Sequence, residues 1–536
     1  MNHRSFVGIS RLLLLTFICT GTLFSVAQAP VSVNEVERAM LKATQYMVDS
    51  VSTNGGYVSS YLPDFSRRWG EMEAYPTMVW VQDPGTVSMG YLFLDAYHAT
   101  KDEYYYQAAQ KVAHALIWGQ LPEGGWNYMI DFAGDRSLKQ WYKTIGRNGW
   151  RLEEFHRYYG NSTFDDDVTS NAARFLLCMY LEKLESHYKP SLEKAIDCIL
   201  NAQYPNGGWP QRYPKKKDLN EDDGIDYTGY YTFNDDVIWE NIQFLLQCYE
   251  VLGESRFLDP ILRGMDFYLL SQDACGAWGQ QLSLDMKVAG ARSYEPAAFL
   301  SQTTYVNAML LLTFYQYTGD RRFLSRVPDA IKWLEKNRLP QDASGRGTTH
   351  PAFVDVKTGT PVYVHRKGSN VTNGAYYVND KDDLPLAHYG AKRIISVEQL
   401  KTEYQRVANL SVEEATKDSP LKVGRYKGVK LPQSAFRVNR PLPPFLGDTI
   451  RVDQVLSALD DRGRWLFKHA FTSHPYRGEG GKKTSTTAYA STNVGDEADM
   501  SPYRDTTDQL YLSTAQYIRN MKVLIDYLIQ AKGMAE

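Results

Sequence analysis

Two short acidic segments of the chain have almost the same sequence. Residues 163–168 are Thr-Phe-Asp-Asp-Asp-Val, and residues 232–237 are Thr-Phe-Asn-Asp-Asp-Val. Acids in front of a helix usually cap its free amides, but one acceptor is enough for that role. Adjacent carboxylates repel one another unless a cation neutralises them. Oxygen ligands from two segments suit calcium, so we predict that Asp165, Asp166 and Asp235 bind Ca²⁺ if the fold brings the segments together.

A second repeat indicates how the fold could do so. A glutamine is followed, always at the same spacing, by a glycine-rich turn and a tryptophan. The copies are Gln120 with Gly124-Gly125-Trp126, Gln203 with Gly207-Gly208-Trp209, and Gln272 with Gly276-Ala277-Trp278, while Asn54-Gly55-Gly56-Tyr57 is a weaker copy. Such a repeat is typical of arrays in which each unit buries its apolar face against the next.

Between these copies, apolar residues recur with the period of a helix, and short breakers divide each stretch into two. We therefore predict an all-α fold, an (α/α) toroid of repeated helical hairpins with long irregular C-terminal loops. An open solenoid is the alternative. The predicted helices are 33–51, 87–97, 105–117, 168–185, 191–202, 237–252, 257–270, 306–317, 323–334 and 513–531, with a further helical stretch near 397–410 inside the irregular region 339–502. In a closed ring, the acidic segments would meet where the hairpins begin.

The N-terminus has the pattern of an export signal. Arg4 and Arg11 precede the apolar run 12–18, and small residues follow up to Ala27. The run is too short to remain in a membrane as a spanning helix. We predict that residues 1–27 are a removed signal peptide, that residues 28–536 form a single catalytic domain, and that the protein is secreted or periplasmic.

Composition excludes several classes of partner. The 59 basic and 62 acidic residues give a net charge of -3 without a basic block, so we expect no nucleic-acid partner. We expect no membrane span and a monomer. The 38 tyrosines and 11 tryptophans are typical of proteins that stack rings on sugars. Cys178 and Cys198 are either buried free thiols or a disulfide, and the cysteine spacing fits no zinc motif.

One part of the chain carries a more specific pattern. Residues 206–214 are Asn-Gly-Gly-Trp-Pro-Gln-Arg-Tyr-Pro, and they are followed in order by 231–236, 291–296, 353–355 and 366–368. Over 163–370 this sequence resembles the pectate lyases of polysaccharide lyase family 10, as a long and divergent member. The resemblance implies an (α/α) toroid, a calcium requirement, and cleavage of polygalacturonate, an acidic polysaccharide, by β-elimination.

The resemblance also implies roles for individual residues. Arg292 matches the arginine that takes the C5 proton of the uronate, and Arg366 is expected to hold the uronate carboxylate together with calcium. We expect Trp209, Arg212 and Tyr213 of the tryptophan loop to bind the substrate. Arginine is ordinarily always protonated, so a base role would require nearby cations and an alkaline medium.

One departure keeps other functions open. Where the family has an arginine, this chain has Ala352, and His350, His365, Lys367 or Arg212 could supply the missing charge. A site without that cation could retain affinity and lose turnover. The alternatives are a non-catalytic glycan-binding protein, a lyase acting on another uronate polymer, or a glycoside hydrolase that uses two carboxylates.

Overall fold

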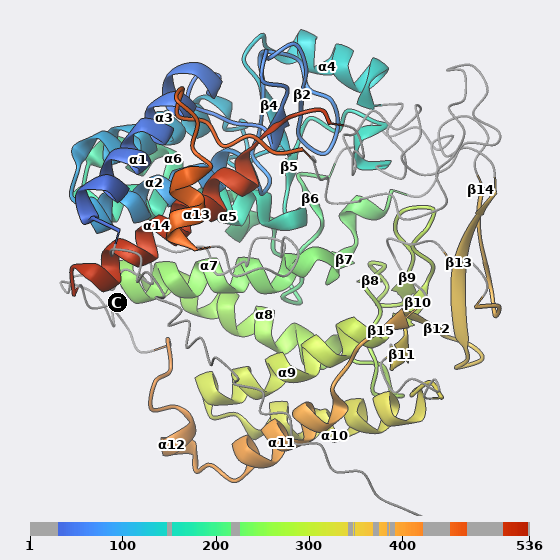
Figure 1. Cartoon of the computed structure of the whole chain (residues 1–536). Helices are drawn as coiled ribbons and strands as arrows, with labels where there is room; N and C mark the ends of the chain where they lie inside the picture. Colours follow the sequence, from blue (N-terminus) through green and yellow to red (C-terminus); the bar gives the residue numbers. More distant parts are fainter. Residues whose placement is uncertain are drawn as a thin grey trace, which may run out of the picture.

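The computed structural model describes residues 31–146, 153–215, 226–340, 347, 349–367, 375–382, 385, 392–421, 451–468 and 508–533. More than half of these residues are helical, and the helices pair into hairpins that lie side by side (Figure 1). The hairpins join α2 to α3, α5 to α6, α7 to α8 and α9 to α10. The predicted hairpins are therefore confirmed.

The bounds of the helices lie close to the predicted ones. They are α1 Val33–Tyr46, continued by the π-helical turn Met47–Val51, α2 Thr86–Thr100, α3 Glu103–Gly119, α4 Asp135–Thr144, α5 Val168–Lys183, α6 Lys189–Ala202, α7 Val237–Leu252, α8 Leu258–Ser271, α9 Ser301–Thr318, α10 Arg321–Lys336, α11 Val397–Ala408, α12 Val412–Ala415, α13 Val452–Ser457 and α14 Thr514–Ala531. The first helices of the hairpins are neighbours, because α14 packs on α2, α2 on α5, and α5 on α7.

The glycine of each tryptophan loop is the joint between successive hairpins. These glycines have a positive φ, and a Cβ atom on them would collide with a backbone carbonyl of the neighbouring unit. The approaches are Gly55 to Lys111 O (φ 88°, 2.3 Å), Gly124 to Lys194 O (φ 108°, 2.1 Å), Gly207 to Arg263 O (φ 98°, 2.0 Å) and Gly276 to Asp329 O (φ 96°, 2.4 Å), each distance measured from the added Cβ. Only glycine combines this conformation with so close an approach.

The glutamine and the tryptophan close the same joint with hydrogen bonds. Gln203 donates from Nε2 both to Gly207 O of its own loop (3.0 Å) and to Pro260 O of the next hairpin (2.9 Å). Trp209 donates from Nε1 to Ile199 O (2.8 Å). The other two glutamine copies make the same pair of bonds. The regular spacing in the sequence is therefore the spacing that lets one amide bridge two hairpins.

A further copy of the joint connects the two ends of the chain. Gly463-Arg464-Trp465 lacks the glutamine, and the sequence pattern did not predict it. Gly463 (φ 83°) packs against Lys42 O of α1, and Trp465 donates from Nε1 to Val455 O (2.9 Å). The helix α14 lies beside α1, and α13 packs on α14 (Figure 1). The path from α12 to α13 runs through residues outside the described ranges, so closure into a toroid remains a prediction.

Short antiparallel strands correct the prediction of an all-α fold. A strand precedes each of α2, α5, α7, α9 and α14, and the strands gather at the ends where these helices begin (Figure 1). They form the sets β16-β1-β2, β10-β12-β13-β14, β11-β15, β3-β4, β5-β6 and β7-β8-β9. Their backbone groups need partners as the chain passes from one hairpin to the next, and adjacent loops supply them.

The strands are short except in one hairpin, β13–β14. Their bounds are β1 Ser60–Tyr61, β2 Arg68–Trp69, β3 Met78–Trp80, β4 Met129–Asp131, β5 Ser162–Thr163, β6 Arg212–Tyr213, β7 Tyr231–Thr232, β8 Gln281–Leu282, β9 Val288–Ala289, β10 Ala298–Leu300, β11 His350–Pro351, β12 Phe353–Asp355, β13 Pro361–Lys367, β14 Ala375–Asn379, β15 Lys392–Arg393 and β16 Leu512–Ser513.

Two further sequence expectations concern cysteines and membranes. Cys178 and Cys198 are free and buried, so the disulfide alternative is wrong. Burial raises the pKa of each thiol to about 12. Within the described ranges, we find no helix with the length and apolar character needed to cross a bilayer.

Candidate active site

The two acidic segments form the same strained turn in front of neighbouring helices. Each is a single 3₁₀ turn, η4 Asp165–Asp167 before α5 and η8 Asn234–Asp236 before α7. Asp166 and Asp235 share the left-handed dihedrals φ 49° and ψ 34°, and the aspartate after each is left-handed too. This conformation costs an L-residue about 1–2 kcal/mol. Such strain is concentrated at functional sites.

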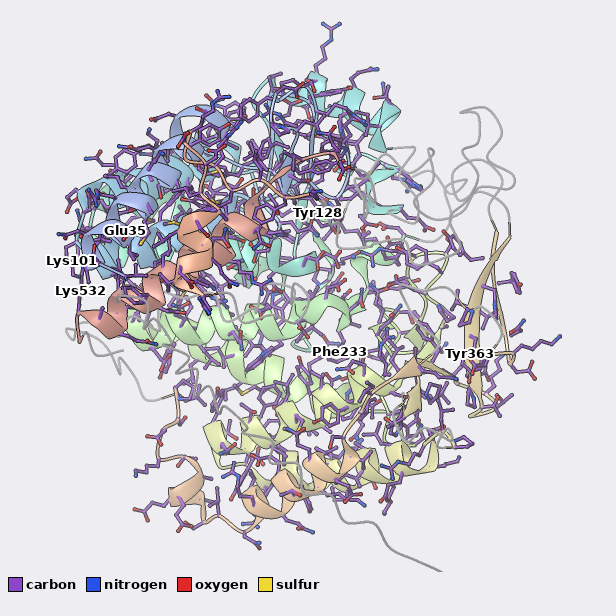
Figure 2. All side chains as sticks on the ribbon, in the orientation of Figure 1. Glu35, Lys101, Tyr128, Phe233, Tyr363 and Lys532 are labelled. Carbon is purple, nitrogen blue, oxygen red and sulfur yellow. The ribbon has the colours of Figure 1, made fainter. Side chains whose placement is uncertain are left out.

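Helix capping does not explain these acids. In the described part of the chain, neither Asp167 nor Asp236 makes a side-chain cap on its helix. The turns η4 and η8 instead lie in contact with each other. The fold therefore brings the two acidic segments together, as predicted. Phe233, next to η8, lies near the centre of the molecule in Figure 2, and Tyr128 lies above it in that view.

Asp165 is the fully buried member of the cluster. Its carboxylate accepts hydrogen bonds from Tyr128 Oη (2.5 Å), Gln211 Nε2 (2.9 Å) and Arg292 Nη2 (2.8 Å). It also shares a hydrogen bond with Asp235. Burial opposes ionisation, but Arg292 and the hydrogen-bond donors outweigh it and hold the pKa of Asp165 below its usual range.

Asp166 and Asp235 bring further negative charge to the cluster. Asp166 accepts from Gln82 Nε2 (2.5 Å), and Asp235 accepts from Asn234 Nδ2 (2.7 Å). Loss of solvent, followed by the charges of Asp165 and Asp166, raises the pKa of Asp235 well above its usual range. A cation at this place would relieve the repulsion.

Arg292 is enclosed by carboxylates. Its side chain is 4% exposed, and its Nε, Nη2 and Nη1 pair with Glu154 (3.1 Å), Asp165 (2.8 Å) and Glu295 (3.2 Å). Burial disfavours the charge, but Glu154, Glu295 and Asp165 raise the pKa of Arg292 well above its usual value. Arg292 is therefore a firmly held guanidinium, which must lose a proton before it can accept one.

Sequence reasoning missed the glutamates that hold this arginine from another segment. They lie in the turn η3, Glu153–Phe155. Glu154 is buried against Arg292, and Glu153 accepts from the backbone N–H of Ser293 (3.0 Å) and from its hydroxyl. Two adjacent glutamates thus bind two adjacent residues. A glutamate pair outside any repeat offers no distinguishing sequence pattern.

Sequence reasoning also missed a degenerate third copy of the acidic segment, which precedes α2. One backbone hydrogen bond begins each copy. These bonds run from Trp80 N to Tyr57 O, from Thr163 N to Trp126 O and from Thr232 N to Trp209 O. This register aligns Gln82 and Asp83 with Asp165 and Asp166. Gln82 bonds to Asp166, and Asp83 accepts from Asn171 Nδ2 (3.2 Å). Gln82 follows Tyr57 at the same spacing at which Asn234 follows Trp209, and this match was the signal that could have found the third copy.

The tryptophan loop packs its aromatic ring into the core. Trp209 is fully buried, and its role in substrate binding stays a prediction. Arg212 is 1% exposed, its guanidinium lies 5.1 and 4.6 Å from the ring centres of Tyr128 and Tyr159, and its contact with substrate also stays a prediction. Both side chains are held by the joint and the core. Tyr213 is partly buried, and its substrate-binding role stays a prediction.

The region after α10 bears on the missing arginine. Arg366 lies in β13 opposite Tyr376 of β14, but its side chain is outside the described part, and its role stays a prediction. Ala352 is 4% exposed and packs in an apolar cluster with Tyr294 and Phe353. At this position apolar packing has therefore replaced the expected charge.

The two histidines considered as substitutes have structural partners. His350 is fully buried, with Nε2 against Leu334 O (2.9 Å). His365 is buried, with Nε2 against Asn379 Oδ1 (2.9 Å). These contacts identify core histidines and not replacements for a substrate-binding cation. The side chain of Lys367 lies outside the described residues.

The acidic side chains can be compared with the needs of calcium. Among the described residues, no group of three or more His, Cys, Asp and Glu side chains is already arranged around a metal position. Asp165 is engaged by its hydrogen-bond donors and by Arg292. Asp166 and Asp235, however, are hard oxygen donors from two contacting turns, and burial together with the charges of Asp165 and Asp166 raises the pKa of Asp235. The residues fit calcium by the chemistry of their oxygens.

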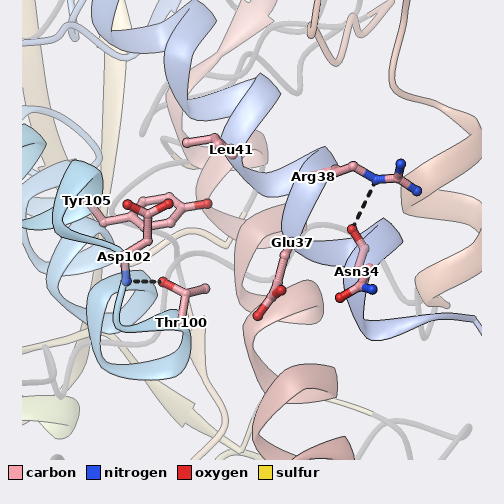
Figure 3. A pocket seen from close by; sticks show the side chains of 7 residues that line it. All are labelled: Asn34, Glu37, Arg38, Leu41, Thr100, Asp102 and Tyr105. Atoms are coloured by element: carbon pink, nitrogen blue, oxygen red, sulfur yellow. Dashed lines mark hydrogen bonds between the residues drawn. The ribbon is translucent and has the colours of Figure 1, made fainter.

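The cavities lie away from this cluster. One, of about 510 Å³, is bordered by α1 and the α2–α3 turn (Figure 3) and includes Glu37, Asp102 and Tyr105. Another, of about 660 Å³, is bordered by residues near Leu62 and Gln509. Neither includes an acid of the two turns, so the candidate site is defined by the clustered side chains.

Comparisons with known proteins agree with the site. Residues 138–376 match the family model described as pectic acid lyase, a segment that contains η3, both acidic turns and Arg292. A family 10 polysaccharide lyase from Cellvibrio cellulosa is 18% identical, with 59% of this chain and 96% of that chain covered and a TM-score of 0.40. A mutant of a family 10 polysaccharide lyase from the same organism, in complex with trigalacturonic acid, is 18% identical, with 52% and 86% covered and a TM-score of 0.34.

Other helical enzymes are similar over more of the chain. The GH76A α-1,6-mannanase from Salegentibacter is 11% identical, with 93% of this chain and 100% of that chain covered and a TM-score of 0.31. None of these structures reaches a TM-score of 0.5, so we rely on the family match and the site. No curated protein sequence matches the chain.

These findings support a polysaccharide lyase. More particularly, residues 138–376 match the pectic acid lyase family model, and the resemblance found in the motifs is confirmed.

Proposed function

We propose that the protein is a secreted, calcium-dependent pectate lyase that cleaves α-1,4-linked galacturonan by β-elimination. One observation carries the proposal. The segment that matches the pectic acid lyase model contains both strained acidic turns, and Arg292 bonds directly to Asp165 of the first turn. An enzyme for an acidic polysaccharide needs positive charge beside the scissile uronate, and the carboxylates of this cluster would bind a cation that supplies it.

The chemistry assigns a task to each residue. β-Elimination removes the C5 proton next to a carboxylate whose negative charge opposes carbanion formation. Asp165, Asp166 and Asp235 would hold calcium, which when bound supplies the positive charge that neutralises that carboxylate. Arg366 is proposed to orient the same carboxylate. Arg292 is proposed to accept the C5 proton.

The proposed base requires a condition that the contacts define. Glu154, Asp165 and Glu295 all favour the charged guanidinium of Arg292. Proton acceptance requires the neutral form, so we expect turnover only in alkaline solution. The three carboxylates also fix the orientation of the Arg292 side chain, as a positioned proton acceptor requires.

The test is an assay on polygalacturonate with and without calcium, followed by the ultraviolet absorbance of the 4,5-unsaturated product. Arg292→Ala should lower kcat by on the order of 10²–10⁴, the usual contribution of a positioned proton acceptor. Arg292→Lys keeps the positive charge but lacks the planar guanidinium group. Compared with Arg292→Ala, it should therefore restore substrate binding better than turnover. Near wild-type turnover of Arg292→Ala would contradict the assignment of the base.

A second candidate function is favoured by Ala352. Its burial among apolar side chains removes a cation that the family uses, and a site weakened in this way binds glycan without cleaving it. Calorimetric binding of polygalacturonate without any unsaturated product would identify this function. Product with new reducing ends but no ultraviolet band would identify a glycoside hydrolase instead.

Two wider features belong to the same proposal. We propose that the hairpins close into an (α/α) toroid and that residues 1–27 are removed on export, leaving a monomer. Sequencing the N-terminus of the exported protein tests the cleavage. Small-angle scattering tests the fold, because an elongated arc would favour the open solenoid.

A further inference from the structure

Each of the successive tryptophan loops places one residue beside the start of the first helix of a hairpin. The backbone carbonyl of this residue accepts a hydrogen bond from the segment that leads into that helix. The bonds run from Val81 N to Tyr128 O (2.7 Å), from Phe164 N to Gln211 O (2.8 Å) and from Phe233 N to Gln280 O (2.8 Å). Tyr128, Gln211 and Gln280 therefore occupy one repeated structural position at the rim that carries η4 and η8.

At two of these positions the side chain binds the acidic turn. Tyr128 and Gln211 both donate to Asp165. In the next repeat the residue that corresponds to Asp165 is Asn234, and its backbone N–H donates to Gln280 O (3.2 Å). The Asn234 amide is turned toward Asp235. Gln211 donates to the carboxylate of Asp165. At the corresponding position beside Gln280, the residue is Asn234, so no such carboxylate is present.

Gln280 is left without a partner as a result. Its side chain is 1% exposed, and neither Oε1 nor Nε2 makes a hydrogen bond to any residue that the structure describes. The adjacent Gln281 is equally buried, yet its Nε2 donates to Thr232 Oγ1 (3.1 Å). Buried polar groups are nearly always satisfied, and an unsatisfied one is destabilising. A polar group other than the described residues is therefore needed at Gln280.

We propose that Gln280 is a substrate-binding residue whose amide hydrogen-bonds to a hydroxyl group of the uronate held against η8. This inference rests on the proposed function. A neutral amide offers both a donor and an acceptor, as a sugar hydroxyl does, whereas the carboxylates of η4 suit a cation. Gln280 thus recognises the neutral part of an acidic sugar next to the place where its charge is neutralised.

The experiment compares Gln280→Met with Gln211→Met. Methionine has a similar volume and no amide, so in the free protein Gln280→Met removes an unsatisfied group, and its Tm should equal or exceed that of the wild type. Its KM for polygalacturonate should rise roughly 3- to 10-fold, the loss of one hydrogen bond. Gln211→Met breaks a bond to the buried Asp165, so its Tm should fall.

The outcomes separate the role of Gln280 from the lyase proposal. An unchanged KM for Gln280→Met, or a Tm lowered as far as that of Gln211→Met with no greater rise in KM, overturns the role of Gln280 and assigns its amide to a structural water. If the wild type binds polygalacturonate without cleaving it, the lyase proposal fails on its own. The calorimetric Kd of the same variants then replaces KM, and an unchanged Kd overturns the role of Gln280.

Discussion

At the scale of single residues, the carboxylates of the site carry an excess of negative charge. Three carboxylates bond to the guanidinium of Arg292, and Asp166 and Asp235 lie beside them. Burial raises the pKa of Glu154 and of Glu295 despite the opposing effect of Arg292. Such a cluster is relieved either by protons or by a cation. The proposed need for calcium and the high pKa of Arg292 thus have the same origin.

The role of Glu154 is to position Arg292, and it can be tested separately from the stability of the fold. Glu154→Gln keeps an acceptor oxygen but loses the charge that directs Nε of Arg292. We expect kcat to fall by on the order of 10-fold to 10²-fold, with a smaller change in KM, because small misplacements of a reacting group are expensive in rate. Glu182→Gln is the control, since Glu182 lies at the end of α5 and pairs with His98 of α2 (2.8 Å). Equal effects of both variants on kcat would contradict the positioning role.

The raised pKa of Asp235 predicts how stability depends on pH in calcium-free solution. A raised pKa in the folded state means that the neutral carboxyl group is favoured there. The contribution of this group to the free energy of unfolding is fully present below its unfolded pKa of 3.8 and is lost as pH rises through its folded pKa. Asp235→Asn mimics the neutral form. Urea unfolding with a chelator should find this variant more stable than the wild type near neutral pH, and the difference should vanish in acid.

Calcium provides the control for that measurement. Added calcium should stabilise the wild type by mass action and leave Asp235→Asn nearly unchanged. An Asp235→Asn protein that is less stable than the wild type at every pH would show that the carboxylate supports the fold and does not await a cation.

At the scale of elements, the helices were predictable and the strands were not. Helical periods persist over many residues, whereas β5 Ser162–Thr163 and β7 Tyr231–Thr232 are too short to have a period. The acidic turns were predictable because they repeat. The structural task of Trp209 was not predictable, because its motif marks the joint between hairpins and its indole N–H is used by its own helix. Glu154 belongs to no repeat, and only the folded chain brings it to Arg292.

The glycine joint makes a prediction at this scale. Gly207→Ala combines an unfavourable φ of 98° with a Cβ that would lie 2.0 Å from Arg263 O. Gly134→Ala has a similar φ of 92° and nothing within 4 Å, so it carries the conformational strain alone. We expect about 1–3 kcal/mol of destabilisation for Gly134→Ala and distinctly more for Gly207→Ala by urea unfolding. Equal losses would mean that the close approach of the two hairpins does not matter.

At the scale of the whole molecule, the same joint that links neighbouring hairpins also links the two ends of the chain. Gly463 packs on Lys42 of α1, and Lys532 beyond α14 pairs with Glu37 of the same helix (2.6 Å). The start of α14 lies beside the first strand of the described chain, because β16 pairs with β1. The site thus depends on an array whose first and last units support each other.

The joint at Gly463 therefore predicts whether the array behaves as a closed unit. In Gly463→Ala, a Cβ at φ 83° would lie 2.8 Å from Lys42 O, and the contact between the loop after α13 and α1 must open. Native-state hydrogen exchange should then lose protection in α1 and α13 together, since units that lose a neighbour also lose the surface it buried. Gly533→Ala is the matched control, because Gly533 also has a positive φ (60°) but nothing within 4 Å. If protection is lost in α13 alone and α1 keeps its exchange rate, then the C-terminal helices are an appendage of an open array, and the proposed toroid is wrong.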